Sequence, residues 1–244
     1  MLEEIYHFLR SFGDHIVNGR YLKRKGYQIE KEISDGNFSR VLVVGKQDTD
    51  EKRIIKYPHP KIVLDGLDIG NGSIEILLSS RIKHIEDEIE ALDKVKGIDG
   101  IAQKIGAFEL PFHWAYSVDN LLRYDLLQWF SLSEPIEAVS FTISDLTEFI
   151  TYQRIPVIVK EYIKGRSMKY GDKITGEENQ RVLINAVKAL HGQGILWNDP
   201  HPKNIVLTSS GKPYIIDLGY VSINPPDFEE WSRRNIRTIE KEFF

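Results

Sequence analysis

No cysteine occurs among the 244 residues of this sequence, and that absence excludes several kinds of chemistry at once. The chain has no disulfide bonds, no cysteine-ligated zinc site and no thiol nucleophile. No stretch reaches about 18 uninterrupted apolar residues, so we expect no membrane span. The opening residues, Met1 to Ile5, lack the basic and then apolar order of a secretory signal, and we therefore expect a cytoplasmic protein.

An excess of positive charge is missing too. The 32 Lys and Arg residues are outnumbered by 36 Asp and Glu residues, which gives a formal net charge of −4 and a pI near 6.0. We therefore expect no broad surface for nucleic acid or an anionic membrane. Hydrophobic residues make up 41% of the chain, which is enough for a packed core in one large domain or in two lobes that share a cleft.

The first part of the chain changes from helical to strand periodicity. Apolar residues at spacings of three and four from Leu2 to Ile16 predict a helix, which Gly19 ends. Three short β-branched segments, separated by turn residues, then predict a three-stranded antiparallel meander: 27–34, 39–45 and 53–57.

A second helix is predicted from about Ser80 to Lys96, where Gly97 stops it. Residues 98–110 and 155–163 are predicted to add strands to the same sheet. The segment 111–154 between them is rich in Trp, Phe and Leu, and its pattern favours no single element.

The second half of the chain reads as mainly helical. Thr175 and Glu178 have the spacing of a capping box, and the helix that follows is predicted to end at Gly192. The remaining segments predict a strand hairpin and a last helix: 204–208, 213–217 and 227–244. Strands in the first half and helices in the second indicate an α+β protein with two lobes.

The densest cluster of polar and charged residue types lies between Asp199 and Gly219. Asn204 and Asp217 flank the predicted hairpin, so we expect them to come close together in space. Carboxylate and amide oxygens are hard donors that suit Mg²⁺, and Asp199 is left to face an acceptor hydroxyl. The alternative interpretation is that Asn, Asp, Pro and Gly are here simply turn residues.

The order of these residues resembles that of the protein-kinase-like superfamily. Asp199 and Asn204 match the family's catalytic loop, in which Asn follows Asp by five residues, and Asp217-Leu218-Gly219 is similar to its metal-binding Asp-Phe-Gly. The resemblance implies that Asp199 is catalytic and that Asn204 and Asp217 bind the metal. It also implies a bilobal fold, with an antiparallel sheet in an N-lobe of residues 1–163 and a reduced, mainly helical C-lobe of residues 164–244.

The same resemblance implies a site for ATP. The segment 159–165 looks like the hinge between the lobes, whose backbone groups hydrogen-bond adenine, and a strand lysine would hold the α- and β-phosphates. The glycine loop keeps a single glycine in this sequence. The residues implied to contact the nucleotide come from that loop, the third strand and the hinge: Gly36, Phe38, Val41, Lys56, Glu161 and Ile163.

Helix geometry selects the carboxylate that would hold Lys56. At about 100° per residue, the apolar face of the helix from Ile82 to Val95 centres about 50° from Glu88. The other acidic residues between 86 and 90 lie roughly 110° or more from that centre. Glu88 therefore points inward, and a buried carboxylate needs a cation, for which Lys56 is the candidate.

Several departures from the family pattern bear on function. Trp197 and Asn198 replace the His-Arg that often precedes the catalytic Asp, and His201 or Lys203 is expected to neutralise the γ-phosphate. The loop with His201 looks like that of aminoglycoside, choline and UbiB-type kinases. Only 25 residues, 244 minus 219, follow Gly219. A C-lobe shortened in this way is similar to that of RIO kinases, the KEOPS-complex kinase and the lipopolysaccharide-kinase group.

The sequence therefore predicts an ATP-dependent phosphotransferase that uses Mg²⁺, or Mn²⁺ in its place. The first hypothesis is a minimal, atypical Ser/Thr protein kinase. The second is a kinase of a small hydroxylated molecule, such as a sugar, a lipid head group or an aminoglycoside-like compound. The third is a pseudokinase that binds nucleotide and regulates a partner. The acceptor is not identified by any of these patterns.

Overall fold

The computed structural model describes residues 22–34, 39–58, 74–111 and 154–244. The predicted N-terminal helix, Gly36, Phe38 and almost all of the segment 111–154 lie outside these residues. The chain divides into two compact units: Met1–Ile82 with Phe108–Val157, and Lys83–Ala107 with Ile158–Phe244. Strands and helices both occur, which confirms the predicted α+β class, while the bilobal arrangement stays a prediction.

The first unit contains the predicted antiparallel meander. Strand β1 (Tyr27–Ser34) pairs with β2 (Ser39–Lys46), and β2 pairs with β3 (Lys52–Pro58). These bounds agree with the predicted segments to within one residue at all six ends. Alternation places Val44 and Ile55, both 0% exposed, on the buried face.

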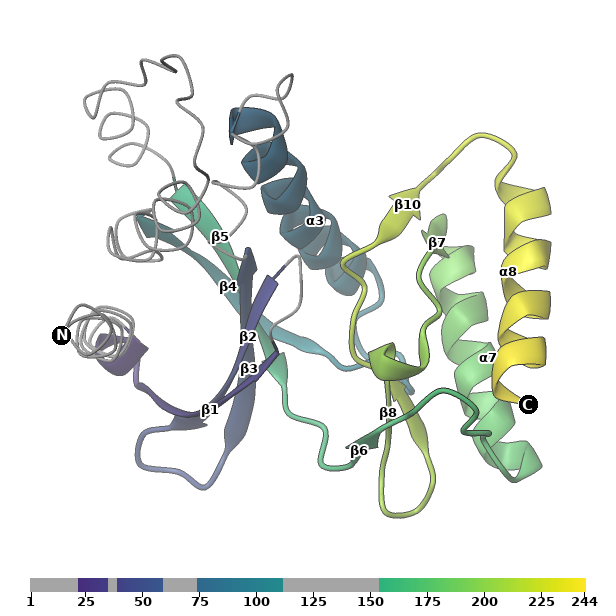
Figure 1. Cartoon of the computed structure of the whole chain (residues 1–244), viewed down its shortest axis with the longest axis horizontal. Coiled ribbons are helices and arrows are strands. Elements are labelled where there is room, and N and C mark those ends of the chain that lie inside the picture. The colour runs from purple at the N-terminus through teal and green to yellow at the C-terminus, as the bar shows by residue number, and fades with distance from the viewer. Residues whose placement is uncertain (1–21, 35–38, 59–73, 112–153) are drawn as a thin grey trace, which may run out of the picture. The chain divides into compact units, whose positions relative to one another are not determined.

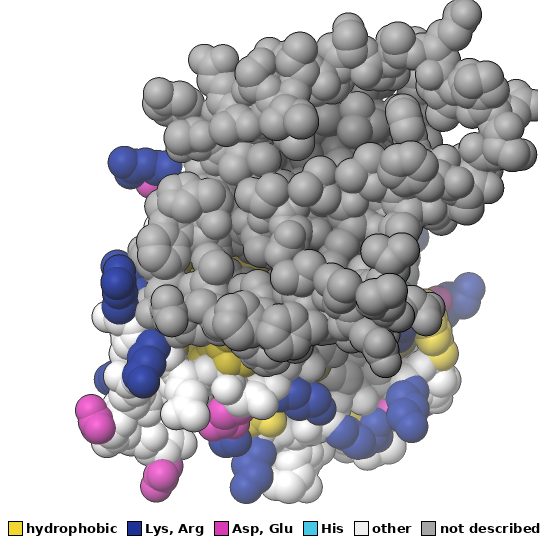
Figure 2. Space-filling model, turned by 60° about the vertical axis from the view of Figure 1, so that its left-hand side comes forward, with side chains coloured by type: hydrophobic (Ala, Val, Ile, Leu, Met, Phe, Trp, Pro, Cys, Tyr) yellow, Lys and Arg dark blue, Asp and Glu magenta, His cyan; other side chains and the backbone are white. Residues whose placement is uncertain are grey.

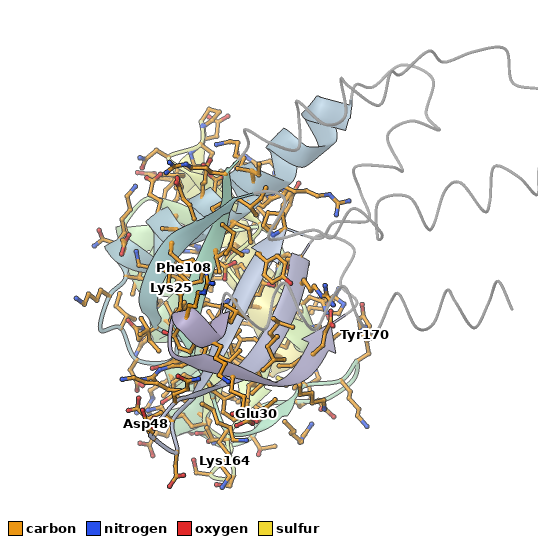
Figure 3. The ribbon with its side chains drawn as sticks, turned by 90° about the vertical axis from the view of Figure 1, so that its left-hand side faces the viewer. Lys25, Glu30, Asp48, Phe108, Lys164 and Tyr170 are labelled. Carbon is orange, nitrogen blue, oxygen red and sulfur yellow. The ribbon has the colours of Figure 1, made fainter. Side chains whose placement is uncertain are left out.

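The meander belongs to a five-stranded sheet with the order β1-β2-β3-β5-β4. Strand β4 spans Lys104–Pro111 and β5 spans Arg154–Glu161, as the sequence predicted for these two regions. Figure 1 shows the sheet strands in purple, teal and green. The Lys25 ammonium lies 5.6 Å from the ring centre of Phe108 on β4, and both side chains are labelled in Figure 3.

Ion pairs join the strands of the meander. Arg40 on β2 binds Glu32 on β1 at 2.6 Å, and Lys52 on β3 binds Glu30 on β1, across the intervening β2. Figure 2 shows both Lys or Arg and Asp or Glu side chains on the described part of one face of the molecule. Cross-strand pairs of this kind favour the observed register.

The second unit is built from three helices and short strands. Helix α3 (Ile74–Lys94) enters it from the first unit, and α7 (Glu177–Gly192) contacts α8 (Phe228–Phe243), as Figure 1 shows. Two small sheets have the orders β6-β8-β9 and β10-β7. The short elements are β6 (Arg166–Ser167), β7 (Ile195–Trp197), the 3₁₀ turn η1 (Pro202–Asn204), β8 (Ile205–Leu207), β9 (Pro213–Ile215) and β10 (Val221–Ile223).

One apolar core unites these elements of the second unit. Ile85 of α3, Leu190 of α7, Trp197 of β7 and Phe243 of α8 are among its members, and each is at most 2% exposed. The core therefore takes residues from the beginning, the middle and the end of the unit. Among the described helices, none is both long enough and apolar enough to cross a membrane.

The predicted capping box at the start of α7 is wrong. The N-cap residue is Gly176, whose φ of 85° lies in the left-handed region, and no side chain caps the helix there. The Thr175 carbonyl instead accepts a hydrogen bond from Asn179 Nδ2 at 3.1 Å. The predicted end is confirmed, because the helix stops at Gly192 and Gly194 adopts a φ of 71°.

Candidate functional site

The loop between β7 and β8 places Asp199 and Asn204 together. Asn204 Nδ2 donates to the backbone carbonyl of Asp199 at 3.1 Å and to its Oδ2 at 2.9 Å. The backbone of the loop is closed as well, because the His201 N–H donates to the Asp199 carbonyl and the Asn204 N–H donates to the His201 carbonyl, both at 2.8 Å. With Nδ2 engaged in this way, the Asn204 amide is fixed in one orientation.

The hairpin of β8 and β9 brings Asp217 to the same end of the second unit. Ile205 pairs with Ile215 in antiparallel register, and the Ile216 N–H donates to the Asn204 carbonyl at 2.9 Å. Asp217 follows directly, and its Oδ1 accepts from the Gly219 N–H at 2.7 Å. The expected approach of Asn204 and Asp217 therefore agrees with the strand register.

Trp197 and Asn198, which depart from the family pattern, join this loop to the strand after Gly219. Strand β7 pairs with β10, so that Trp197 lies opposite Val221. The Asn198 backbone N–H donates to the Tyr220 carbonyl at 3.1 Å, and Asn198 Nδ2 donates to Ser222 Oγ at 2.8 Å. The two residues before Asp199 thus have a structural role, with Trp197 fully buried in the core.

His201 is engaged through both of its ring nitrogens. Its Nδ1 accepts from the Lys203 backbone N–H at 3.1 Å, which caps η1, and its Nε2 contacts the hydroxyl of Tyr170. A nitrogen that accepts a hydrogen bond carries no proton, so neutral His201 has its proton on Nε2 and donates it to Tyr170. The Tyr170 ring, labelled in Figure 3, is 72% exposed.

Glu88 is fully buried on α3, as its helical phase predicts. Its side chain is 0% exposed, while Glu86 and Glu90 are exposed. Within the second unit its cation is Lys160 of β5, whose Nζ lies 2.5 Å from Glu88 Oε1 and whose side chain is 4% exposed. Lys56 belongs to the first unit, so the expected pair of Lys56 with Glu88 stays a prediction.

The other residues expected to contact ATP are distributed over both units. Lys56 on β3 is 4% exposed and lies opposite Val41 of β2 in the strand register. In the second unit, Glu161 ends β5 and its backbone N–H donates to the Gln103 carbonyl at 3.0 Å, while Ile163 follows in the connection to β6. Lys203 is exposed on η1.

A buried histidine links α8 to the strand that precedes Asp199. His191 Nε2 contacts Asn235 Oδ1 at 3.1 Å, His191 Nδ1 contacts Ser232 Oγ at 2.7 Å, and Asn235 Nδ2 donates to the Trp197 carbonyl at 2.7 Å. Burial lowers the pKa of His191 below its usual value, and the hydrogen bond to Asn235 opposes that shift. The imidazole is therefore neutral at pH 7.

Three residues of this region were missed by sequence reasoning: Lys160, Tyr170 and Asn235. For Lys160 a signal exists, because a lysine that ends the apolar run Val157-Ile-Val159 needs a buried partner. No pattern in the sequence singles out Tyr170 or Asn235, since each contacts a residue more than 30 positions away.

The oxygen donors that the second unit places together are few. Within the described part of the chain, no three His, Cys, Asp or Glu side chains form a group that could hold a metal ion. Asn204 and Asp217 would provide two oxygen ligands. Mg²⁺ characteristically binds one or two protein oxygens and takes water and phosphate oxygens for the rest, so this donor set fits that metal.

Comparison with curated proteins finds similarity over short segments, and no protein-family model matches the chain. The chain is 33% identical over 70 residues to a probable cAMP-dependent protein kinase catalytic subunit of Encephalitozoon cuniculi. It is 34% identical over 74 residues to the probable serine/threonine-protein kinase PknB of Bifidobacterium longum, and 40% identical over 74 residues to the serine/threonine-protein kinase PknG of Mycobacterium leprae.

These matches are partial on both sides. They cover 26%, 28% and 27% of this chain, and 22%, 11% and 10% of the three kinases. The chain therefore matches less than a quarter of the length of each of these relatives. Together with an α+β structure that contains an antiparallel sheet, the matches support a relationship to the protein-kinase-like superfamily.

Proposed function

We propose that this protein is an ATP-dependent phosphotransferase, and most specifically a minimal, atypical Ser/Thr protein kinase. The observation that carries the proposal is the bonding of Asn204: its side chain holds Asp199, and its carbonyl holds the residue before Asp217. Asn204 thereby links Asp199 to the segment of Asp217, and these three residues have the polar side chains that phosphoryl transfer uses. The short similarities to Ser/Thr protein kinases favour a protein acceptor.

Asn204 and Asp217 would hold Mg²⁺, which supplies charge neutralisation at the phosphates when it is bound. The protein's own contribution is to fix both ligands before the metal arrives. Asp217 is fixed through the bond from the Gly219 N–H, and Asn204 through its two bonds to Asp199. Such bonding of the ligands is what gives a metal site its geometry.

Binding of the nucleotide is assigned to the residues that the kinase resemblance implies. Because the Glu161 N–H already donates to Gln103, the Glu161 carbonyl is the group proposed to accept from the adenine amino group. The Ile163 N–H is the proposed donor to the ring. Lys56, held by Glu88, is the proposed partner of the α- and β-phosphates, with Val41 and the loop of Gly36 and Phe38 beside them.

Asp199 is proposed to orient the acceptor hydroxyl and to take its proton late in the transfer. Of the two candidate cations beside it, we favour Lys203 for the γ-phosphate. Its side chain is exposed, whereas both ring nitrogens of His201 already have protein partners. Most of the rate enhancement then comes from position and charge, because the transition state of phosphoryl transfer is loose.

The test is incubation of the purified protein with Mg²⁺ and ATP labelled on the γ-phosphate. Asp217→Ala is expected to abolish turnover, and Asp199→Asn to abolish turnover while it leaves ATP binding nearly unchanged. Labelled protein would support a protein kinase, and free phosphate without labelled protein would favour the small-molecule kinase. If neither product exceeds that of Asp217→Ala, even with added cell extract, the phosphotransferase proposal is wrong and the pseudokinase hypothesis replaces it.

A further inference from the structure

Two buried charges meet next to Asp217 in the second unit. Lys160 Nζ donates to Glu88 Oε1 at 2.5 Å and to the Ile216 carbonyl at 2.7 Å. Glu88 Oε1 also faces the Leu218 backbone N–H at 3.4 Å. Ile216 and Leu218 are the two residues that flank Asp217, so the ion pair contacts the backbone on both sides of the expected metal ligand.

Both charges of this ion pair are buried. The side chains of Lys160 and Glu88 are 4% and 0% exposed, and charges removed from water need partners with good geometry. An ion pair of this kind contributes little net stability compared with apolar residues of the same volume. A role in fixing a particular backbone geometry would explain why charges occupy this place in the core.

The chain also fixes the side chain of Asp217 from the other direction. The Gly219 N–H donates to Asp217 Oδ1 at 2.7 Å, which restricts the rotation of the carboxylate. Helix α3 supplies Glu88 and strand β5 supplies Lys160, so two elements distant in sequence converge on one short stretch, residues 216–218. A contact from each of them leaves that stretch little freedom.

We propose that Lys160 is a positioning residue: together with Glu88 it clamps the backbone on both sides of Asp217 and sets the position of that carboxylate for the metal. This inference rests on the proposed function, in which Asp217 is a metal ligand. Lys160 does not touch metal or nucleotide in this role. Its removal should weaken the metal and leave binding of the metal-free nucleotide unchanged.

A matched control exists on the same helix. Lys104 of β4 pairs with Asp93 of α3, and its side chain is 17% exposed. Lys160→Met and Lys104→Met each remove one lysine that binds a carboxylate of α3. Only Lys160 also contacts the backbone before Asp217. An effect that comes merely from the loss of an ion pair on α3 should therefore appear in both variants, whereas an effect on Asp217 should appear only in Lys160→Met.

The first readout needs no nucleotide. Amide hydrogen exchange of peptides that contain Leu218 is expected to be at least about 10-fold faster in Lys160→Met than in the wild type, with exchange in α7 unchanged. In Lys104→Met the same peptides should exchange as in the wild type. Unchanged exchange around Leu218 in Lys160→Met would overturn the clamp.

The second readout is the affinity for Mn²⁺ in the presence of a non-hydrolysable ATP analogue, measured by electron paramagnetic resonance. Lys160→Met is expected to lose about 10- to 100-fold in Mn²⁺ affinity, the range typical for groups that position metal ligands. Binding of the analogue in EDTA should change less than about threefold. If the Mn²⁺ affinity of Lys160→Met stays within about threefold of the wild type while Asp217→Ala binds no Mn²⁺, this inference is overturned and the proposed function is left intact.

The remaining outcomes are also decisive. If the wild type binds no Mn²⁺ with the analogue, the proposed function fails, and the positioning role fails with it. If Lys160→Met does not fold, Lys160→Arg keeps a cation beside Glu88 while it replaces the Nζ that donates to the Ile216 carbonyl, and it is judged by the same two criteria.

Discussion

Gly165 lies immediately before β6, and it allows β6 to approach β8. A Cβ atom placed on Gly165 would lie 2.2 Å from the Leu207 carbonyl oxygen and 2.7 Å from Val206 Cγ1. Beyond this contact, Arg166 pairs with Leu207, and the Met168 N–H donates to the Ile205 carbonyl at 2.9 Å. Gly165→Ala therefore forces β6 and β8 apart.

The magnitude follows from the distance. Ordinary C···O contacts are about 3.3–3.6 Å, so the strands must separate by about 1 Å. That movement stretches a hydrogen bond of 2.9 Å past any useful length, at a cost of about 1 kcal/mol, in addition to about 1–3 kcal/mol for overpacking. Alanine also lowers the conformational entropy of the unfolded chain, which offsets about 0.4–1 kcal/mol of this loss. We therefore expect a net loss of about 1–3.6 kcal/mol in the free energy of unfolding.

Gly192, the last residue of α7, provides the control. A Cβ atom there would meet nothing within 4 Å, and alanine is favoured over glycine in a helix by up to about 1 kcal/mol. Urea unfolding followed by circular dichroism should therefore place Gly165→Ala well below the wild type and Gly192→Ala at or slightly above it. Equal stability of the two variants would refute the reasoning. Because β8 begins directly after Asn204, we also expect Gly165→Ala to weaken Mn²⁺ binding with the ATP analogue.

Three further perturbations test other parts of the second unit. Because the pKa of His191 is lowered in the folded protein, the unfolded chain binds a proton first as the pH falls, and stability should decrease below about pH 6.5. His191→Gln should therefore make urea unfolding less dependent on pH between about 7.5 and 5.5, and an equal dependence would contradict this. Phe243→Ala should cost about 3–5 kcal/mol in the same assay because its ring is fully buried, and a loss below 1 kcal/mol would show that α8 does not share the core. Asp99→Asn should cost at most about 1 kcal/mol, since its bond to the partly exposed Lys212 is a surface ion pair whose effect salt removes.

Patterns that repeat along the chain were sufficient to predict the regular elements. The meander, the hairpin of β8 and β9, and the end of α7 follow from alternation, turn residues and glycine. The burial of Glu88 follows from the phase of α3, because one face of that helix is apolar and Glu88 lies near its centre. The short strands β6 and β7 pair with β8 and β10, which are not their neighbours in sequence, so no hairpin turn indicated them.

Contacts between distant residues were beyond such reasoning. Glu88 could be recognised as a carboxylate in need of a cation, yet Lys160 could not be chosen over other lysines without the packing of β5 against α3. At the start of α7 the spacing of Thr175 and Glu178 indicated a cap, but the left-handed Gly176 changes the path of the backbone and no side-chain cap forms. Local signals therefore located the candidate site, and tertiary packing determined what supports it.

The position of α8 has a consequence for how this protein is made. The helix follows the other described elements in the sequence, yet Ile239 and Phe243 belong to the core of the second unit, and the Ile174 N–H donates to the Phe243 carbonyl. A ribosome that adds about 5–20 residues per second delivers the loop of Asp199 and Asn204 several seconds before those core residues. During that interval Asn235 is not yet in place to hold the Trp197 carbonyl. The loop of Asp199 and Asn204 should therefore reach its final form only after translation of α8 is complete. Under the proposed function, a stalled nascent chain that ends before α8 should fail to bind the ATP analogue with Mn²⁺.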